Sequence, residues 1–232
     1  ELRRDAVASG IKEAENPGQG TQPTALQRYQ RLFQSARDKD QVEEIAKALN
    51  KLGEKPSISE HFGYVTHWHL IGPFDSTESK GFNVAYPPEA KVDLHTTLKG
   101  KDNANLTWKP FVTSDRYATV GLNKGLEKFK DSVGYAYSTI VSEKELPVEI
   151  RIASQNAVKI FLNGKPIFQR EEYHHGMAMD QHVGRGILKA GRNEILIKVC
   201  QNEQTEAWAQ KWSFQLRLCD HLGAATPFSL VK

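Results

Sequence analysis

The sequence is poor in cysteine and methionine, has no long apolar run and shows no concentration of charge of one sign. It holds two cysteines and two methionines in 232 residues. No apolar run approaches the roughly 20 residues that cross a bilayer as a helix, so we expect no membrane span. Lysines and arginines are interleaved with acids, and the formal net charge is +3. Without a basic stripe, nucleic-acid binding is not expected.

The two cysteines, Cys200 and Cys219, allow at most one internal disulfide. We interpret 193–200 and 212–219 as paired antiparallel strands, which puts the two cysteines at opposite ends of the pair. About seven residues at roughly 3.4 Å each then separate the sulfurs, too far for a disulfide. We therefore expect two free, half-buried thiols, which leave the cellular compartment undecided.

Catalytic motifs are also missing from the sequence. There is no G-x-S-x-G elbow, no G-x-x-x-x-G-K-[ST] loop and no G-x-G-x-x-G. A glycosidase needs two facing carboxylates, and nothing in the sequence pairs Glu171, Glu172 or Asp180. We therefore assign no catalytic residue and do not expect an enzyme.

The first quarter of the chain is polar and then helical. Residues 1–22 end in ENPGQGTQP, which predicts a flexible leader. Thr24 and Gln27 have the spacing of a capping box, and Asp40 can cap a second helix, so 23–56 is predicted to be a helical hairpin. It resembles the last unit of a helical-repeat array, although a helical cap on the next domain explains it equally well.

From residue 60 the helical period gives way to alternating strands. Ile195 and Ile197, for example, alternate with polar neighbours. We predict strands at Tyr64–Ile71, Thr107–Val112, Gly134–Val141, Pro147–Ala153, Val158–Leu162, Glu194–Cys200 and Trp212–Cys219. Such spacing indicates a β-sandwich over 60–222. The segment 76–106 is expected to be a long loop, and 223–232 a tail on the surface.

Asn163-Gly164, within VKIFLNGKPIF, is the strongest local signal. A type I′ turn needs positive φ at both central positions, and Asn-Gly meets that need best. Pro166 has no N–H to donate to a sheet, so the returning strand is predicted to lie at an edge.

The order of VKIFLNGKPIF, LKAGRNEILIKV and WSFQLRLCD resembles the galactose-binding-like jelly-roll domains. Upstream, WHLIGPF, YPPE and YAYSTI are similar to a variant found in exported multidomain bacterial proteins of unknown role. The resemblance implies a mainly β, antiparallel jelly-roll sandwich, a carbohydrate partner, an optional structural calcium and an extracellular or periplasmic location. A chain that opens with Glu1 is compatible with a removed targeting segment or with a trimmed piece.

YHHGMAMDQH (173–182) is the chemically richest loop. Tyr173 can stack on a sugar face while His174, His175 and Asp180 bond to hydroxyls. A transition-metal site and a polar loop whose histidines bond to backbone are the alternatives. The spacing matches no metal motif, so no metal ligand is assigned.

Two aromatic positions outside this loop also matter. Trp208 lies outside the strand pattern, where it either stacks on a sugar or caps the sandwich. Trp68 is flanked by His67 and His69, so the histidines share one strand face and Trp68 takes the core face. The histidine pair is similar to cupin metal sites, but no glutamate follows at the required distance.

We therefore predict a non-catalytic, carbohydrate-binding-like module of a larger exported protein, with no required cofactor. The predicted ligand-binding residues are Tyr173, His174, His175, Asp180 and Trp208. Two alternatives stay open. One is a structural or protein-interaction module that packs against other domains of its parent protein. The other is a metal-dependent enzyme that uses the histidine-rich loop.

Overall fold

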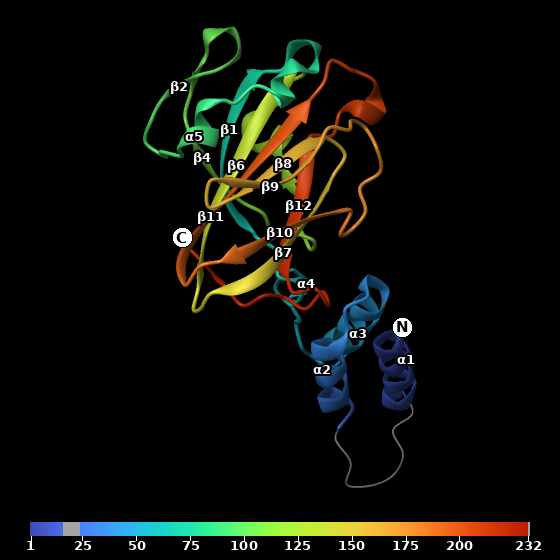
Figure 1. The fold of residues 1–232 in the computed structure, drawn as a ribbon. Helices are drawn as coiled ribbons and strands as arrows, with labels where there is room; N and C mark the ends of the chain where they lie inside the picture. The colour runs from blue at the N-terminus through green and yellow to red at the C-terminus, as the bar shows by residue number, and fades with distance from the viewer. Residues whose placement is uncertain (16–23, 232) are drawn as a thin grey trace.

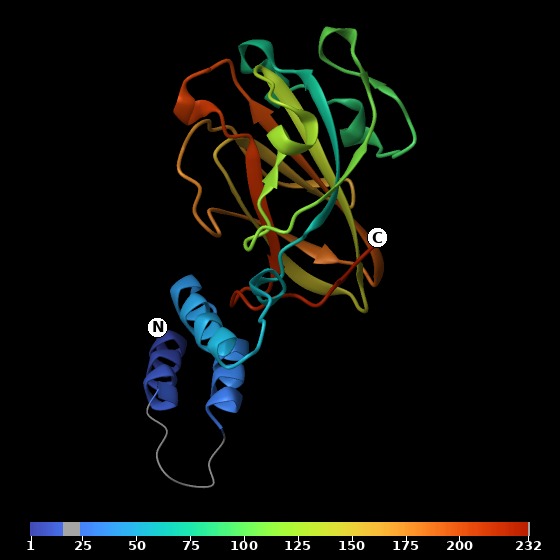
Figure 2. The same cartoon turned by 180° about the vertical axis from the view of Figure 1, so that it is seen from behind.

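The computed structural model describes residues 1–15 and 24–231. Two antiparallel β-sheets pack face to face, with helices at one end and residues 76–106, here named the insert, at the other (Figures 1 and 2). The predicted mainly β, antiparallel jelly-roll sandwich is confirmed. Within the described ranges, no helix is both long and apolar enough to cross a membrane.

The seven predicted strands are present with shifted bounds, whereas the strand at His182–Leu188 and several two-residue strands were not predicted. The helices are α1 (Leu2–Glu15), α2 (Ala25–Ser35), α3 (Lys39–Lys51), α4 (Ile58–Phe62), α5 (Pro87–Ala90) and α6 (Leu122–Leu126), with short 3-10 helices at Thr77–Phe82 (η1), Lys101–Asn103 (η2) and Ala207–Ala209 (η3). The strands are β1 (His67–Asp75), β2 (Leu98–Lys99), β3 (Asn105–Leu106), β4 (Lys109–Val112), β5 (Val120–Gly121), β6 (Ser132–Ser142), β7 (Leu146–Ser154), β8 (Ala157–Leu162), β9 (Lys165–Arg170), β10 (His182–Leu188), β11 (Gly191–Gln201), β12 (Ser213–Cys219) and β13 (Ser229–Leu230).

The large sheet has the strand order β4-β1-β6-β11-β8-β9, and β13 of the tail also pairs with β6. The small sheet has the order β10-β7-β12-β5. Their facing sides enclose the main apolar core, which includes Trp68 and Trp212. Trp68 was expected inside, because it falls on the face of its strand opposite the two histidines.

The predicted pairing of 193–200 with 212–219 is wrong. β11 pairs with β6 and β8 in the large sheet, whereas β12 pairs with β7 and β5 in the small sheet. Alternation shows which face a strand buries and not which neighbour it has, and here the chain changes sheets between the two strands. Both cysteines are nevertheless free, and both are fully buried rather than half-buried.

The hairpin between β8 and β9 confirms the turn prediction. Asn163 and Gly164 have φ values of 52° and 76°, as a type I′ turn requires. The Asn163 side chain donates to Asn193 Oδ1 at 2.9 Å and accepts from the Glu194 N–H at 2.9 Å. These bonds tie the turn to the start of β11. The strand β9 that contains Pro166 lies at the sheet edge, as predicted.

The prediction of a flexible leader over 1–22 is wrong where the structure describes it, because Leu2–Glu15 forms helix α1. Val7, Ile11 and Ala14 recur at helical spacing and are buried in a core shared with α2 and α3. Only three apolar residues form this stripe, so packing against neighbouring helices, and not the local pattern, stabilises α1. Residues 16–22 lie outside the described part.

The two predicted helices within 23–56 are present as α2 and α3. The capping box of Thr24 and Gln27 is confirmed. Asp40, however, is not a cap, because α3 starts earlier, after Asp38. Its carboxylate instead pairs with Arg4 of α1, which holds the first helix beside the third.

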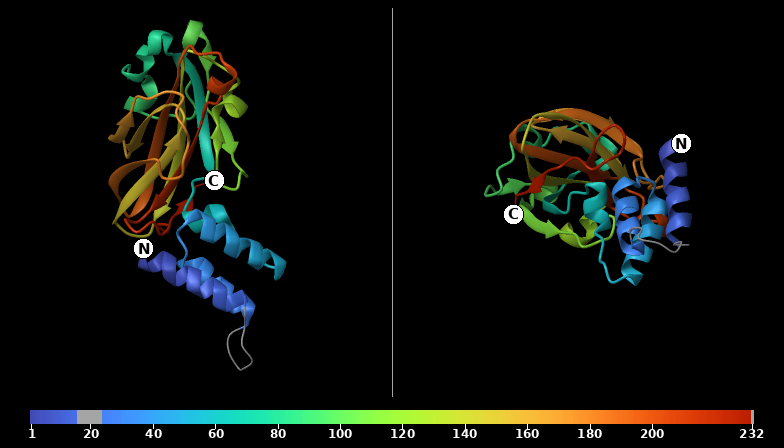
Figure 3. Two further views of the ribbon diagram at one scale, coloured as in Figure 1. Left: turned by 90° about the vertical axis from the view of Figure 1, so that its right-hand side faces the viewer. Right: turned by 90° about the horizontal axis from the view of Figure 1, so that it is seen from below.

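The four N-terminal helices, α1 to α4, are here named the helical unit. This unit contacts the sandwich through α4 and the segment after it (Figure 3). The Val65 N–H donates to Leu216 O at 3.0 Å, and the Leu218 N–H donates to Gly63 O at 2.9 Å. The segment that links α4 to β1 therefore forms backbone hydrogen bonds along the edge of β12. The tail, expected on the surface, adds β13 to β6 on the other sheet.

The insert contains η1, α5, η2 and the short β2–β3 pair, so it is more ordered than the predicted long loop. It packs on the outer face of the large sheet, the face turned away from the small sheet. A second apolar cluster forms beneath it, in which Phe82 and Leu106 of the insert meet Tyr135 and Leu196 of the sheet. The large sheet is therefore covered on both sides at this end.

Candidate functional site

The fold brings only some of the predicted ligand-binding residues together. The rings of Tyr173, His174 and Trp208 are neighbours, whereas His175 and Asp180 have other partners. Tyr173 packs against the apolar cluster beneath the insert, and burial raises the pKa of its phenol. His174, with a left-handed φ of 55°, turns away and its Nε2 contacts Asn202 Oδ1. Its ring meets Trp208 edge to face, with 5.2 Å between centroids. Trp208, for which the sequence left sugar stacking and a cap on the sandwich open, is 59% exposed.

His175 and His182 form a separate pair. Their ring centroids lie 5.9 Å apart, and His182 stacks on Phe168 at 5.1 Å. The pKa of His182 is lowered, first by burial and then by the nearby His175. Within residues 1–15 and 24–231, no group of three or more His, Cys, Asp and Glu side chains is arranged to hold a metal ion.

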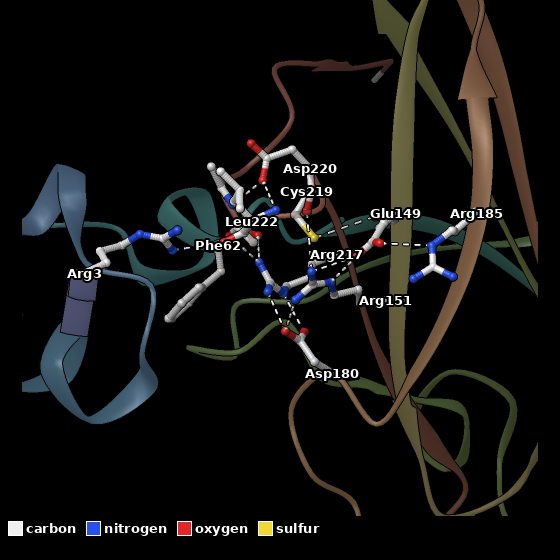
Figure 4. Close-up of polar contacts among 12 residues, drawn as sticks. Arg3, Phe62, Glu149, Arg151, Asp180, Arg185, Arg217, Cys219, Asp220 and Leu222 are labelled. Atoms are coloured by element: carbon white, nitrogen blue, oxygen red, sulfur yellow. Dashed lines mark hydrogen bonds and ion pairs between the residues drawn. The ribbon is translucent and has the colours of Figure 1, made fainter. Parts of the chain in front are cut away.

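Asp180 points inward at two arginines of the small sheet (Figure 4). Arg217 donates to both carboxylate oxygens at 2.6 Å, and Arg151 donates to Oδ2 at 2.8 Å. These arginines are register partners on β12 and β7. Arg217 also donates to Phe62 O of α4 at 3.2 Å. Asp180 therefore fastens the loop to the small sheet and to the helical unit.

This geometry corrects the prediction that Asp180 faces a ligand. Burial works to raise the pKa of its carboxyl, but hydrogen bonds from Arg217 and Arg151 outweigh burial, and the pKa lies below its ordinary value. Both oxygens of the Asp180 carboxylate accept hydrogen bonds from guanidinium groups, so Asp180 holds the loop 173–182 in place rather than facing a ligand. The sequence could not reveal this role, since the partners lie 29 and 37 residues away.

A different site lies on the outer face of the large sheet, on the half that the insert leaves uncovered. A hollow of about 360 Å³, here named the open groove, lies there. Its lining residues are His67, Trp68, His69, Leu94, Pro110, Phe111, Val112, Tyr137, Ser138, Thr139, Arg192 and Val231. They come from β1, β4, β6 and β11, from the insert and from the tail. None of them is acidic.

Strand register explains why these side chains meet. His69 is the partner of Tyr137, and His67 is the partner of Val112, so all four share the outer face. Trp68 points the other way into the core, as predicted from the alternation. Partial burial lowers the pKa of His69. The groove thus combines imidazole groups with apolar surface.

Arg192 is the fixed polar group of the groove. One guanidinium nitrogen, Nη2, donates to Tyr137 Oη at 3.2 Å and to Thr139 Oγ1 at 3.1 Å. Glu194 lies 3.6 Å from Arg192 Nε, an ion pair longer than a hydrogen bond. The arginine side chain is still 56% exposed. Two hydroxyls therefore orient a guanidinium that can reach a ligand.

The covered half of the same face shows a related group of side chains sealed from water. Lys198 is fully buried and donates to Phe82 O at 3.1 Å, Val84 O at 2.6 Å and Glu89 Oε1 at 2.8 Å. All three ammonium donors are therefore used. Tyr135, the register partner of Lys198, donates to the same Glu89 oxygen at 2.5 Å. The insert supplies this carboxylate.

Sequence reasoning missed the open groove, although two signals for it existed. One is the histidine pair around Trp68, and the other is YAYST, which puts Tyr135 and Tyr137 on one strand face. Neither signal shows that Arg192 lies beside Tyr137. That neighbour depends on which strands pair.

Searches among protein-family models found no match to the chain. No curated protein matches it either. Solved structures with weakly similar folds include an anti-sigma factor domain-containing protein, at 13% identity over 73% of this chain and 46% of that one, with a TM-score of 0.38. A β-glucosidase from Kluyveromyces marxianus in complex with glucose matches at 11% identity over 68% of this chain and 17% of that one, with a TM-score of 0.38. A family 35 carbohydrate binding module from an environmental isolate matches at 16% identity over 47% of this chain and 83% of that one, with a TM-score of 0.30. The chain spans less than half of the first two structures.

Proposed function

We propose that the chain is a non-catalytic module that binds carbohydrate in the open groove. The observation that carries the proposal is the groove itself, in which an apolar wall faces a small set of positioned polar groups. Ligand sites for small molecules combine these two features, and their volumes start at about 300 Å³. At about 360 Å³ the groove suits a ligand the size of a sugar.

Each part of the groove has a use in binding a sugar. Leu94, Val112 and Val231 supply apolar surface for the C–H face of a sugar ring. Arg192 and His69 supply hydrogen-bonding groups for hydroxyls. Glycoside hydrolysis needs two carboxylates at the bond that breaks, and no acidic residue lines the groove. These features favour binding over hydrolysis.

The test is a broad glycan array, followed by calorimetry with each glycan that binds. Arg192→Ala removes charged hydrogen bonds and should weaken binding roughly 10- to 100-fold. The matched control is Arg185→Ala, because Arg185 is 79% exposed on β10 of the other sheet. It should bind like the unchanged protein.

The double variant Tyr173→Ala with Trp208→Ala tests the loop surface predicted from the sequence. It should leave affinity unchanged if the groove is the site. Loss of binding in this variant, with Arg192→Ala unaffected, would move the site to the loop and overturn the groove. No binding of any glycan at millimolar concentration would refute the carbohydrate function.

A further inference from the structure

We infer that the open groove selects sugars that carry a carboxylate, an inference that rests on the proposed function. The groove lining has one permanently charged residue, Arg192, and no Asp or Glu, and its two histidines can donate N–H groups without carrying a charge. A planar guanidinium pairs with a carboxylate through parallel hydrogen bonds, which gives both strength and direction. The lining is therefore complementary to a negatively charged ligand.

The covered half of the sheet shows how this face accommodates a carboxylate. There a cation and a tyrosine hydroxyl, from Lys198 and Tyr135, both donate to one oxygen of Glu89. In the open half, strands β11 and β6 again present a cation and a tyrosine, Arg192 and Tyr137. The insert brings no carboxylate into the open groove, and Glu194 of β11 is instead the carboxylate beside Arg192 and Tyr137. A ligand can supply one inside the groove.

Glu194 is the one acidic group that the structure places beside this arginine, at 3.6 Å from Nε. Its side chain is about half exposed, and it belongs to β11 outside the groove lining. An incoming carboxylate therefore competes with Glu194 for the guanidinium. Removing the charge of Glu194 should therefore give a variant that binds acidic sugars more tightly than the natural chain.

The experiment compares glucuronate and galacturonate with glucose and galactose by calorimetry at one ionic strength. The acidic sugars should bind at least tenfold more tightly. Arg192→Gln keeps an amide donor near Tyr137 and Thr139 but removes the charge. It should reduce the affinity for acidic sugars by about tenfold, and that for neutral sugars by much less. Raising the salt concentration should reduce the preference, because ions screen an exposed pair.

Glu194→Gln should raise the affinity for acidic sugars severalfold and leave that for neutral sugars unchanged. Thermal unfolding checks that both variants are folded. Equal binding of acidic and neutral sugars, or an equal loss of both in Arg192→Gln, would overturn the carboxylate preference while the proposed function stands. Binding of neither kind of sugar would instead count against the proposed function.

Discussion

The outer face of the large sheet has two halves with similar side chains, whose cations differ in exposure. Lys198 and Tyr135 lie beneath the insert and bond to Glu89. Arg192 and Tyr137 lie on the same two strands and line a hollow, to which the insert contributes Leu94 but no carboxylate. The covered cation is fully buried, whereas the open one is half exposed. The cations and tyrosines of the two halves are similar, and burial of the cation beneath the insert is what separates the structural pair from the candidate binding pair.

The difference has an energetic reason. A buried ammonium is tolerated only when its charge is paired and each of its donors is bonded, and the insert provides all three acceptors for Lys198. An exposed guanidinium is also solvated by water, so Arg192 depends little on its long ion pair with Glu194. Substitutions in the covered half should therefore affect stability, and equivalent ones in the open half should affect binding.

The largest effect is expected for Glu89→Gln. This change leaves the buried Lys198 without its counter-charge, and removing one partner of a buried pair costs about 3–5 kcal/mol of the free energy of unfolding. Glu194→Gln is the matched change in the open half and should alter stability by less than about 0.5 kcal/mol. Urea unfolding measures both. Equal losses in the two variants would contradict the distinction between the halves.

Asp180→Asn extends the comparison to the small sheet. Replacing the carboxylate weakens charged hydrogen bonds from Arg217 and Arg151, which should reduce the free energy of unfolding by about 2–3 kcal/mol. Glycan affinity at a temperature where the variant is folded should not change. A variant with unchanged stability and lost binding would restore Asp180 as a ligand contact.

The tyrosine pair gives a smaller effect. Tyr135→Phe removes a buried hydrogen bond to Glu89 and should destabilise the protein by about 1.5 kcal/mol. Tyr137→Phe should cost less than about 1 kcal/mol, since Arg192 also bonds to Thr139 and reaches water. Thermal unfolding ranks the two variants, and calorimetry should show weaker glycan binding only for Tyr137→Phe. The reverse ranking would mean that the open half is the more tightly packed one.

The smallest expected effect concerns pH. Burial lowers the pKa of His69, so the folded protein favours its neutral form. The contribution to stability is complete above the unfolded pKa of about 6.5 and is lost as pH falls through the lower folded value. His69→Gln should therefore reduce the stability difference between pH 8 and pH 5 slightly. His95→Gln, at an exposed position, is the control and should leave the difference unchanged.

Local signals predicted local structure well. The turn at Asn163-Gly164 needs positive φ at two adjacent residues, and few pairs other than Asn-Gly supply it. The capping box at Thr24 needs only a partner three residues away. Helix α1 was missed because its three buried apolar residues form a weak pattern without the partner helices.

The candidate site depends on residues that are distant in sequence. Its walls join β1, β4, β6 and β11 with the insert and the tail, and each contact follows from strand order. Asp180 shows the same dependence, because a carboxylate in a polar loop is indistinguishable from a ligand contact until Arg151 and Arg217 are placed beside it.

The sequence by itself determined the mainly β class, the edge hairpin and the core face of Trp68. These features follow from a period of two residues and from backbone geometry, which act over a few positions. Tertiary structure alone decided that β11 and β12 lie in different sheets, that Glu89 neutralises Lys198, and that Arg192 faces a groove. Such contacts depend on burial and charge over the whole fold. No local pattern in the sequence therefore predicts which half of the outer face of the large sheet stays open.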